Sequence, residues 1–340
     1  MKKLKKMTAL VLSLVMLIAL CACGGGSAQT DSKAPASDGG TASADSGAKT
    51  SDYPKGAITM IVNYSAGGGT DLAARALGDA AGNILGGTIT VSNVTGGSGT
   101  VGVTELANSK ADGYTIGVAT LSPLALVPWQ LEVTYTPDSF KYICAFGQYG
   151  YGIVVAKDSP YQTLDDLIEA AKSAPINFGA TGYPQPFTMD DLAEMTGAQF
   201  NFVSYSGTTD LITDVLGGFV PFAMCDMASF ASYVKSGDMR LLASATDKRW
   251  DVAPDVPTLQ EMGYDTTCNS YMGLCVPADV PDDIVETLRD AFEKASDDAT
   301  YKEILENCNL TWAYMSGDEY ETLVRDMYKE FGERLAEANG

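Results

Sequence analysis

The stretch that decides the fold is AITMIVNYSAGGGTD, residues 57–71. Residues 57–63 form an apolar run rich in β-branched side chains, which predicts a strand, and a helix is expected over residues 70–85. The three glycines between them, residues 67–69, allow positive φ and a close approach of the backbone to a ligand. The first N–H groups of the helix favour a negatively charged group. The stretch therefore predicts a strand–turn–helix unit that can hold an anion.

Short apolar runs alternate with helical patterns along the rest of the chain, which is typical of α/β architecture. Two more glycine-containing turns follow predicted strands, at residues 96–99 and 205–209. The chain is expected to cross between two α/β units near residues 150 and 272, with the last helices returning to the first unit. This topology leaves a cleft between two lobes, where ligand sites tend to form.

The expected organisation is one lobe of residues 53–152 plus 273–340 and a second lobe of residues 153–272. Capping boxes mark two helix starts, Thr163 with Asp166 and Ser316 with Glu319. The last helix carries an apolar stripe that predicts core packing, made of Tyr320, Leu323, Val324, Met327, Phe331 and Leu335.

Two further elements are expected in detail. Residues 219–225 are interpreted as a strand of the second lobe. Pro281 fits the first turn of a helix, whose buried stripe would be Ile284, Leu288, Ala291 and Phe292.

The N-terminus has the pattern of a lipoprotein signal. Four lysines precede an apolar run over residues 8–20, which is shorter than the roughly 20 residues of a spanning helix. Leu20, two small residues and Cys23 follow, so we expect a signal peptide over residues 1–22 and acyl chains on Cys23. Residues 23–52 are polar and small, as in a flexible tether. The chain is thus predicted to be anchored to the cell membrane by lipid, on its extracytoplasmic face.

Composition excludes several functions. The net charge is −21, which argues against nucleic-acid binding, where a basic surface is expected. The chain has no histidine, which removes Ser-His-Asp and Cys-His catalysis and most zinc enzymes. The cysteines beyond the signal sit among apolar or small residues and are interpreted as buried hydrophobes, with a bond between Cys268 and Cys275 left open; they are Cys144, Cys225, Cys268, Cys275 and Cys308.

The ordered motifs resemble one known family, the substrate-binding proteins of tripartite tricarboxylate transporters. The matching blocks are Tyr53-Pro54, residues 58–63, residues 67–71, Asn93, residues 96–102, residues 111–115, Val203, Tyr205, Gly207, residues 216–218, Asp226, residues 253–258, Glu261 and Gly263. The resemblance implies a Venus-flytrap, periplasmic-binding-protein-like α/β fold with two lobes on a two-strand hinge. It also implies capture of a small carboxylate and its delivery to membrane permease subunits, by a protein that is not an enzyme.

The resemblance carries a binding site onto this chain. In the first lobe the implied ligand contacts are Tyr64, Gly68, Gly69, Thr70, Asp71, Thr120 and Ser122. In the second lobe they are Thr181, Gly182, Tyr205, Ser206, Gly207 and Asp226. We expect no catalytic residue, cofactor or metal, a small organic acid or amino acid as ligand, and a monomer.

This chain departs from the family pattern near the expected site. Ala66 stands where a proline is usual, Ser206 where a basic residue is frequent, and Val94-Thr95 where Arg-Pro is common. With a cation lost, Asp226 could meet an ammonium group of an amino-acid ligand, or it could simply cap the next helix.

Two interpretations remain open for a pair of aromatic side chains, and three for the function of the whole chain. Tyr183 and Phe187 could stack on an aromatic ligand or close their own loop. The chain could instead be an enzyme with Asp71 and Asp226 as an acid/base pair, or a surface sensor or adhesion module.

Overall fold

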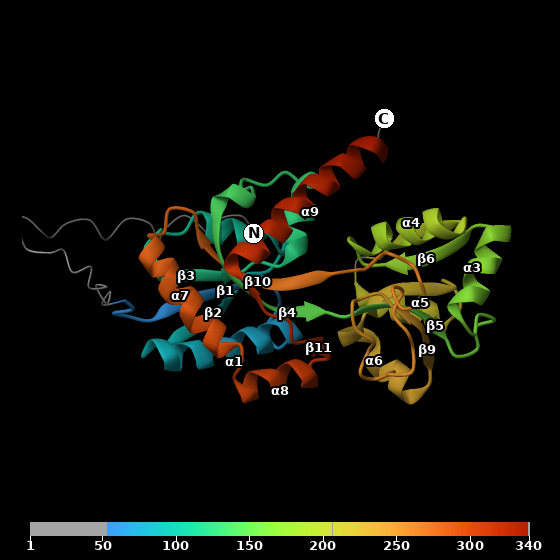
Figure 1. Cartoon of the computed structure of the whole chain (residues 1–340), viewed down its shortest axis with the longest axis horizontal. Coiled ribbons are helices and arrows are strands. Elements are labelled where there is room, and N and C mark those ends of the chain that lie inside the picture. Colours follow the sequence, from blue (N-terminus) through green and yellow to red (C-terminus); the bar gives the residue numbers. More distant parts are fainter. Residues whose placement is uncertain (1–52, 206, 339–340) are drawn as a thin grey trace, which may run out of the picture. The chain divides into compact units, whose positions relative to one another are not determined.

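A computed structural model describes residues 53–205 and 207–338 of the chain (Figure 1). Its first sheet has the strand order β11-β4-β10-β3-β1-β2, with β12 also paired to β4. The strands are β1 Ile58–Val62, β2 Ile89–Asn93, β3 Thr115–Val118, β4 Phe140–Tyr149, β10 Ser270–Pro277, β11 Leu310–Thr311 and β12 Met315–Ser316. β1 runs parallel to β2 and β3, whereas β10 is antiparallel to β3 and β4.

Helices cover both faces of this sheet. One core contains Met60 and Val62 of β1, and the other contains Ile61, so β1 is apolar on both faces. Figure 1 shows α1 and α8 on one side of the sheet and α9 on the other. The helices of this first lobe are α1 Gly69–Leu85, α2 Thr100–Ala107, α7 Asp282–Ala295, α8 Ala299–Asn307 and α9 Gly317–Ala338.

The second lobe is built on a sheet of order β7-β6-β8-β5-β9. Its strands are β5 Tyr151–Ala156, β6 Ile176–Ala180, β7 Phe200–Ser204, β8 Phe222–Asp226 and β9 Met239–Ser244. Its helices are α3 Leu164–Ser173, α4 Gln185–Thr196, α5 Thr208–Leu216 and α6 Met227–Ser236. Gly150 alone separates β4 of the first sheet from β5 of the second, and the chain returns to the first sheet at Ser270. The two-lobed α/β fold expected from the sequence is confirmed.

The two capping boxes are also confirmed. The Asp166 carboxylate accepts from the Thr163 N–H while Thr163 Oγ1 accepts from the Asp166 N–H. Ser316 and Glu319 make the same reciprocal pair at the start of α9.

Some local expectations are wrong. β8 begins at Phe222, because Gly218 has a left-handed φ of 71° and turns the chain, which leaves Phe219 80% exposed. Pro281 is the N-cap of α7 and lies outside its first turn. Val285 joins the buried stripe of that helix, whereas Ile284 is half-buried and packs against the same core.

The cysteines of the described chain are all free thiols, so Cys268 and Cys275 are not bonded. Four are buried, as expected, and Cys308 is half-buried. Within the described residues, no helix is both long and apolar enough to cross a membrane.

Candidate functional site

The glycine turn after β1 presents the N-terminus of α1. Gly67 has a φ of 80°, and Gly68 is the N-cap without a side-chain acceptor. The N–H groups of Gly69 and Thr70 follow it in the first turn, where the helix itself offers no acceptor. This end of α1 therefore provides the backbone donors that the sequence predicts for an anion.

Asp71 holds this turn in place. Its carboxylate accepts hydrogen bonds from the Gly67 N–H at 2.8 Å, Asn93 Nδ2 at 2.8 Å and Arg75 Nε at 3.0 Å. Burial alone would raise the pKa of the Asp71 carboxyl, but these hydrogen bonds outweigh it and hold that pKa below its usual value. Both oxygens are thus engaged inside the loop, with the side chain only 2% exposed. Asp71 positions the loop, and it lacks the free oxygen that an acid/base catalyst needs.

Two pairs of hydroxyl groups lie beside this turn, and we call their four residues the hydroxyl cluster: Tyr64 with Thr120, and Thr70 with Tyr149. Tyr64 Oη lies 2.8 Å from Thr120 Oγ1, and Thr70 Oγ1 lies 2.5 Å from Tyr149 Oη. Burial raises the pKa of both tyrosines, and the nearby Tyr64 raises that of Tyr149 further. The phenols are therefore neutral at physiological pH and can donate hydrogen bonds.

Asp226 reaches the same place from the second lobe. It ends β8, and its carboxylate caps α6 by accepting from the Ser229 N–H at 2.8 Å, which confirms the capping interpretation. Its charge acts on the phenols of Tyr149 and Tyr151, so it lies near the hydroxyl cluster. Burial raises the pKa of this half-buried carboxyl. The structure thus pairs Tyr64 with Thr120 and Thr70 with Tyr149, and it places Asp226 near Tyr149. That these residues contact a solute stays a prediction.

The other expected contacts of the second lobe are less engaged. Thr181 is exposed, with Gln185 Nε2 at 3.5 Å from its hydroxyl, and Gly182 has a φ of 147°. Tyr205 donates to Asp214 at 2.7 Å, and Gly207 is the N-cap of α5. Among the described residues, these groups form no hydrogen bond to the hydroxyl cluster. Ser206 lies outside the described residues, and Ser122 of the first lobe is half-buried.

Tyr149 is the member that the sequence did not reveal. It is separated from Thr70 by 79 positions and comes together with it only when β4 and α1 are packed. Its place directly before Gly150, where the chain changes sheets, is the one signal that could have marked it.

Comparison with known proteins shows the family of this chain. A model of the tripartite tricarboxylate transporter family receptors matches residues 73–339. The chain belongs to this family. A Cupriavidus necator protein, called UPF0065 protein in gbd 5'region, is 32% identical over 296 residues, which are 86% of this chain and 90% of that one. An Agrobacterium vitis relative is 30% identical over 257 residues, covering 72% of this chain and 73% of its own.

Solved structures agree with this assignment. The receptor resembles the crystal structure of a TctC solute-binding protein from Polaromonas, with a TM-score of 0.74 and 26% identity over 84% of this chain and 99% of that one. The periplasmic binding protein BugD gives a TM-score of 0.66, with 26% identity and the same coverage. The family consists of extracytoplasmic solute-binding receptors and is not a family of enzymes.

Positive charge and metal ligands are sparse at this receptor's site. Arg75, next to the glycine turn, is paired with Asp71 at 2.9 Å and also donates to Asn93 Oδ1. Within the described part of the chain, no group of three or more Cys, Asp or Glu side chains is arranged to hold a metal ion.

Tyr183 and Phe187 pack on each other, with ring centroids 4.6 Å apart, and both contact Phe331 of α9. They close their loop against α9, which supports the interpretation that these rings close their own loop rather than stack on a ligand.

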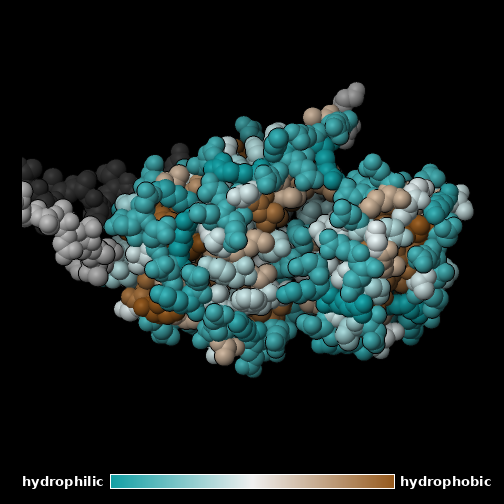
Figure 2. Space-filling view, viewed as in Figure 1, coloured by the Kyte–Doolittle hydropathy of each residue, from teal (hydrophilic) through white to brown (hydrophobic). Residues whose placement is uncertain are grey.

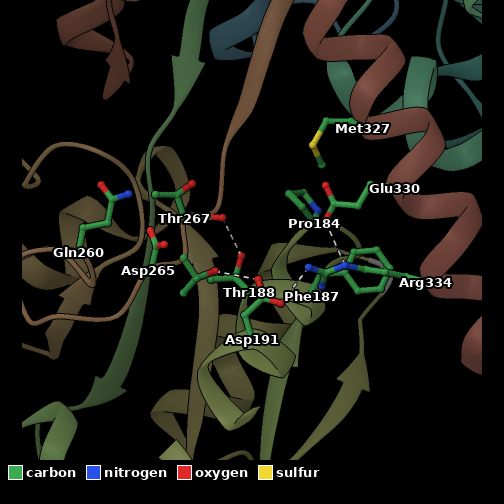
Figure 3. Close-up of a pocket in the computed structure, with 11 residues that line it drawn as sticks. Pro184, Phe187, Thr188, Asp191, Gln260, Asp265, Thr267, Met327, Glu330 and Arg334 are labelled. Carbon is green, nitrogen blue, oxygen red and sulfur yellow. Dashed lines mark hydrogen bonds and ion pairs between the residues drawn. The ribbon is translucent and has the colours of Figure 1, made fainter. Parts of the chain in front are cut away.

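A cavity of about 270 Å³ lies beside this contact, between α4, the segment before β10 and α9 (Figure 3). A second cavity of about 320 Å³ lies in the second lobe, next to Arg240. Neither is lined by the hydroxyl cluster or by Asp226.

Proposed function

We propose that this receptor captures a small carboxylate-bearing solute between its lobes and delivers it to the membrane subunits of a tripartite tricarboxylate-type transporter. The observation that carries the proposal is the position of Asp226 of the second lobe, which pairs with Tyr151 in its sheet and lies near Tyr149 of the hydroxyl cluster. Lobe closure on a solute requires donors and acceptors from both sides of a cleft but no reactive group.

The first lobe would hold the carboxylate. The N–H groups of Gly69 and Thr70 stand at the positive end of α1. The neutral phenols of Tyr64 and Tyr149 add hydroxyl donors, now satisfied by Thr120 and Thr70, which can be exchanged for a solute oxygen. Two Rhodopseudomonas palustris proteins that share this fold at 22% identity were solved with malate and with adipate, so the fold accommodates small carboxylates.

The second lobe would select against a second carboxylate. The ionised form of Asp226 is disfavoured by burial, which outweighs the hydrogen bonds that its carboxylate accepts from the Ser229 N–H, the Ser229 hydroxyl and its own N–H. A negative group on the solute would worsen this cost, whereas an ammonium group would offset it. We therefore propose a solute with one carboxylate and a positively charged or hydrogen-donating end, such as an amino acid.

The anchor belongs to the same proposal. Cys23 and the tether lie outside the described residues, and the signal pattern before them supports acylation of Cys23 and a place on the extracytoplasmic face of the cell membrane. The face seen in Figure 2 is largely hydrophilic, with apolar residues in small separate groups. This face carries no large apolar patch of the kind that an adhesion module would need, which supports the tethered monomer that we propose.

A thermal-shift screen of the non-acylated chain from residue 24 onward tests the capture function. Amino acids and small organic acids are added one at a time. A solute at 100-fold its Kd stabilises the folded state by about 2.7 kcal/mol, which raises Tm by roughly 4–5 °C for a protein of this size. The proposal is contradicted if the panel gives no shift at all, or if a bound solute is chemically converted.

A further inference from the structure

The first turns of α9 belong to the first lobe. Tyr320 and Val324 are fully buried in that lobe, and Tyr320 Oη donates to the Ala119 carbonyl at 2.7 Å. Arg325 pairs with Asp138 at 2.5 Å, again within the first lobe. This half of the helix is therefore fixed to the first sheet and its surroundings.

The last turns of α9 contact both lobes: the Tyr328 carbonyl accepts from Trp129 Nε1 of the first lobe, and Phe331 and Arg334 contact the second. The Phe331 ring lies 4.5 Å from that of Phe187 and 6.1 Å from that of Tyr183, centroid to centroid. Arg334 Nη2 lies 2.9 Å from Asp191 Oδ1, and its guanidinium stands 4.9 Å from the Phe187 ring centre. Figure 3 shows Arg334 of α9 directed at Phe187 and Asp191 of α4. One helix thus links the two lobes.

Arg334 forms the ion pairs of this contact between the lobes. Besides Asp191, it pairs with Glu330 of its own helix at 3.0 Å. Two acids thus contact this arginine, its charge also lowers the pKa of the nearby Asp190 carboxyl against the effect of burial, and Asp265 lines the same cavity. Reversal of the Arg334 charge would leave the facing acids to repel one another across the gap.

We propose that the last turns of α9 are a latch that restrains separation of the lobes, formed by Phe331 and Arg334 against Tyr183, Phe187 and Asp191. The proposal rests on the proposed function, because the latch holds the segment directly after Thr181 and Gly182, which are expected to contact the solute. The adjoining cavity of about 270 Å³ has polar walls and leaves this interface loosely packed, so its contacts can break while each lobe stays folded. Lobe opening must part Phe331 from Phe187, as in hinge motions around ligands.

The test needs no solute. Hydrogen–deuterium exchange and solution X-ray scattering are measured on the unliganded wild type and on Arg334→Glu, with Arg334→Ala as a milder variant. Arg325→Glu is the matched control, because it makes the same charge change on the same helix but within the first lobe. Loss of the ion pair and of the cation–π contact predicts about five- to tenfold faster exchange in residues 327–337 and in α4. The radius of gyration should also rise.

The double variant Asp191→Arg with Arg334→Glu restores an ion pair with reversed polarity and should recover most of the protection. The latch is refuted if Arg334→Glu behaves like Arg325→Glu, if faster exchange stays confined to α9, or if the double variant recovers nothing. These outcomes are independent of the thermal-shift screen, so the exchange data support or refute the latch even if no solute in the panel binds.

Discussion

Asp71 and Asp226 occupy similar places, one in each lobe. Each follows a strand at the carboxyl edge of its sheet and lies at the start of a helix, Asp71 in the first turn of α1 and Asp226 as the N-cap of α6. Asp71 accepts from three neighbouring residues, whereas the Asp226 side chain accepts from Ser229. The same residue type in the same kind of position is therefore a scaffold in one lobe and an available charge in the other.

The opposite pKa shifts express this difference. A carboxyl whose pKa is lowered on folding contributes stability above its ordinary pKa, and that stability is lost as pH falls through the lowered value. A carboxyl whose pKa is raised on folding lowers the free energy of unfolding as pH rises from its ordinary pKa through the raised value. The first case describes Asp71 and the second describes Asp226.

The largest effect is expected from Asp71→Ala. The change leaves Arg75, the Gly67 N–H and Asn93 without their shared acceptor. Because the Arg75 side chain is 43% exposed, water can solvate its guanidinium, which limits the loss of stability. The free energy of unfolding should fall by about 2–3 kcal/mol, measured by urea denaturation. The variant should also lack part of the stability that the wild type loses as pH falls from the ordinary carboxyl pKa of about 3.9 through the lowered pKa of Asp71.

Asp79→Ala is the matched control, since Asp79 is an exposed acid on the same helix. If both variants lose equal stability, the view of Asp71 as the support of the glycine turn is wrong.

A change in binding rather than in folding is expected from Asp226→Asn. Asparagine is as good an N-cap as aspartate, so stability at neutral pH should stay the same or rise slightly. Affinity for an ammonium-bearing solute should fall about tenfold or more, which corresponds to a lost charge-assisted hydrogen bond of about 1.4 kcal/mol. Titration calorimetry with the solute found in the screen measures this change.

Asp210→Asn, in the exposed first turn of α5, is its control. Unchanged or tighter binding by Asp226→Asn would show that the solute brings no ammonium group to this side of the cleft.

Tyr149→Phe is expected to have the smallest effect. It removes one hydroxyl and leaves Thr70 Oγ1 without its partner at 2.5 Å. The free energy of unfolding should fall by about 1 kcal/mol. Solute affinity should fall roughly threefold, which corresponds to about 0.6 kcal/mol of binding free energy. Tyr233→Phe, on α6 of the second lobe, is the comparison variant. A Tyr149→Phe protein with wild-type affinity and stability would remove the hydroxyl cluster from the account.

Much of the fold could be predicted because its signals are local. The strand expected over residues 57–63 and the helix expected over residues 70–85 match β1 and α1 to within one residue at each end, because glycine turns separate them. The capping box of Ser316 and Glu319 joins two residues that are only three apart in the sequence, so it could also be predicted.

The roles within the site were less visible because they depend on distant partners. Asn93 meets Asp71 across 22 positions and Tyr149 meets Thr70 across 79, and no periodicity encodes either pair. The apolar stripe of α9 packs into a core, as expected, and that core contains Tyr320, Val324 and Phe331. Tyr183 and Phe187 of the second lobe pack against the same core at Phe331. A stripe predicts which face is buried but not that side chains of a second lobe join it.

A crystal structure of the receptor with a solute from the screen tests the central claim most directly. The account predicts the solute's carboxylate within hydrogen-bond distance of the Gly69 and Thr70 N–H groups, with its other end between Tyr149 and Asp226. A solute seated in the cavity between α4 and α9, or one that touches neither the hydroxyl cluster nor Asp226, would contradict it.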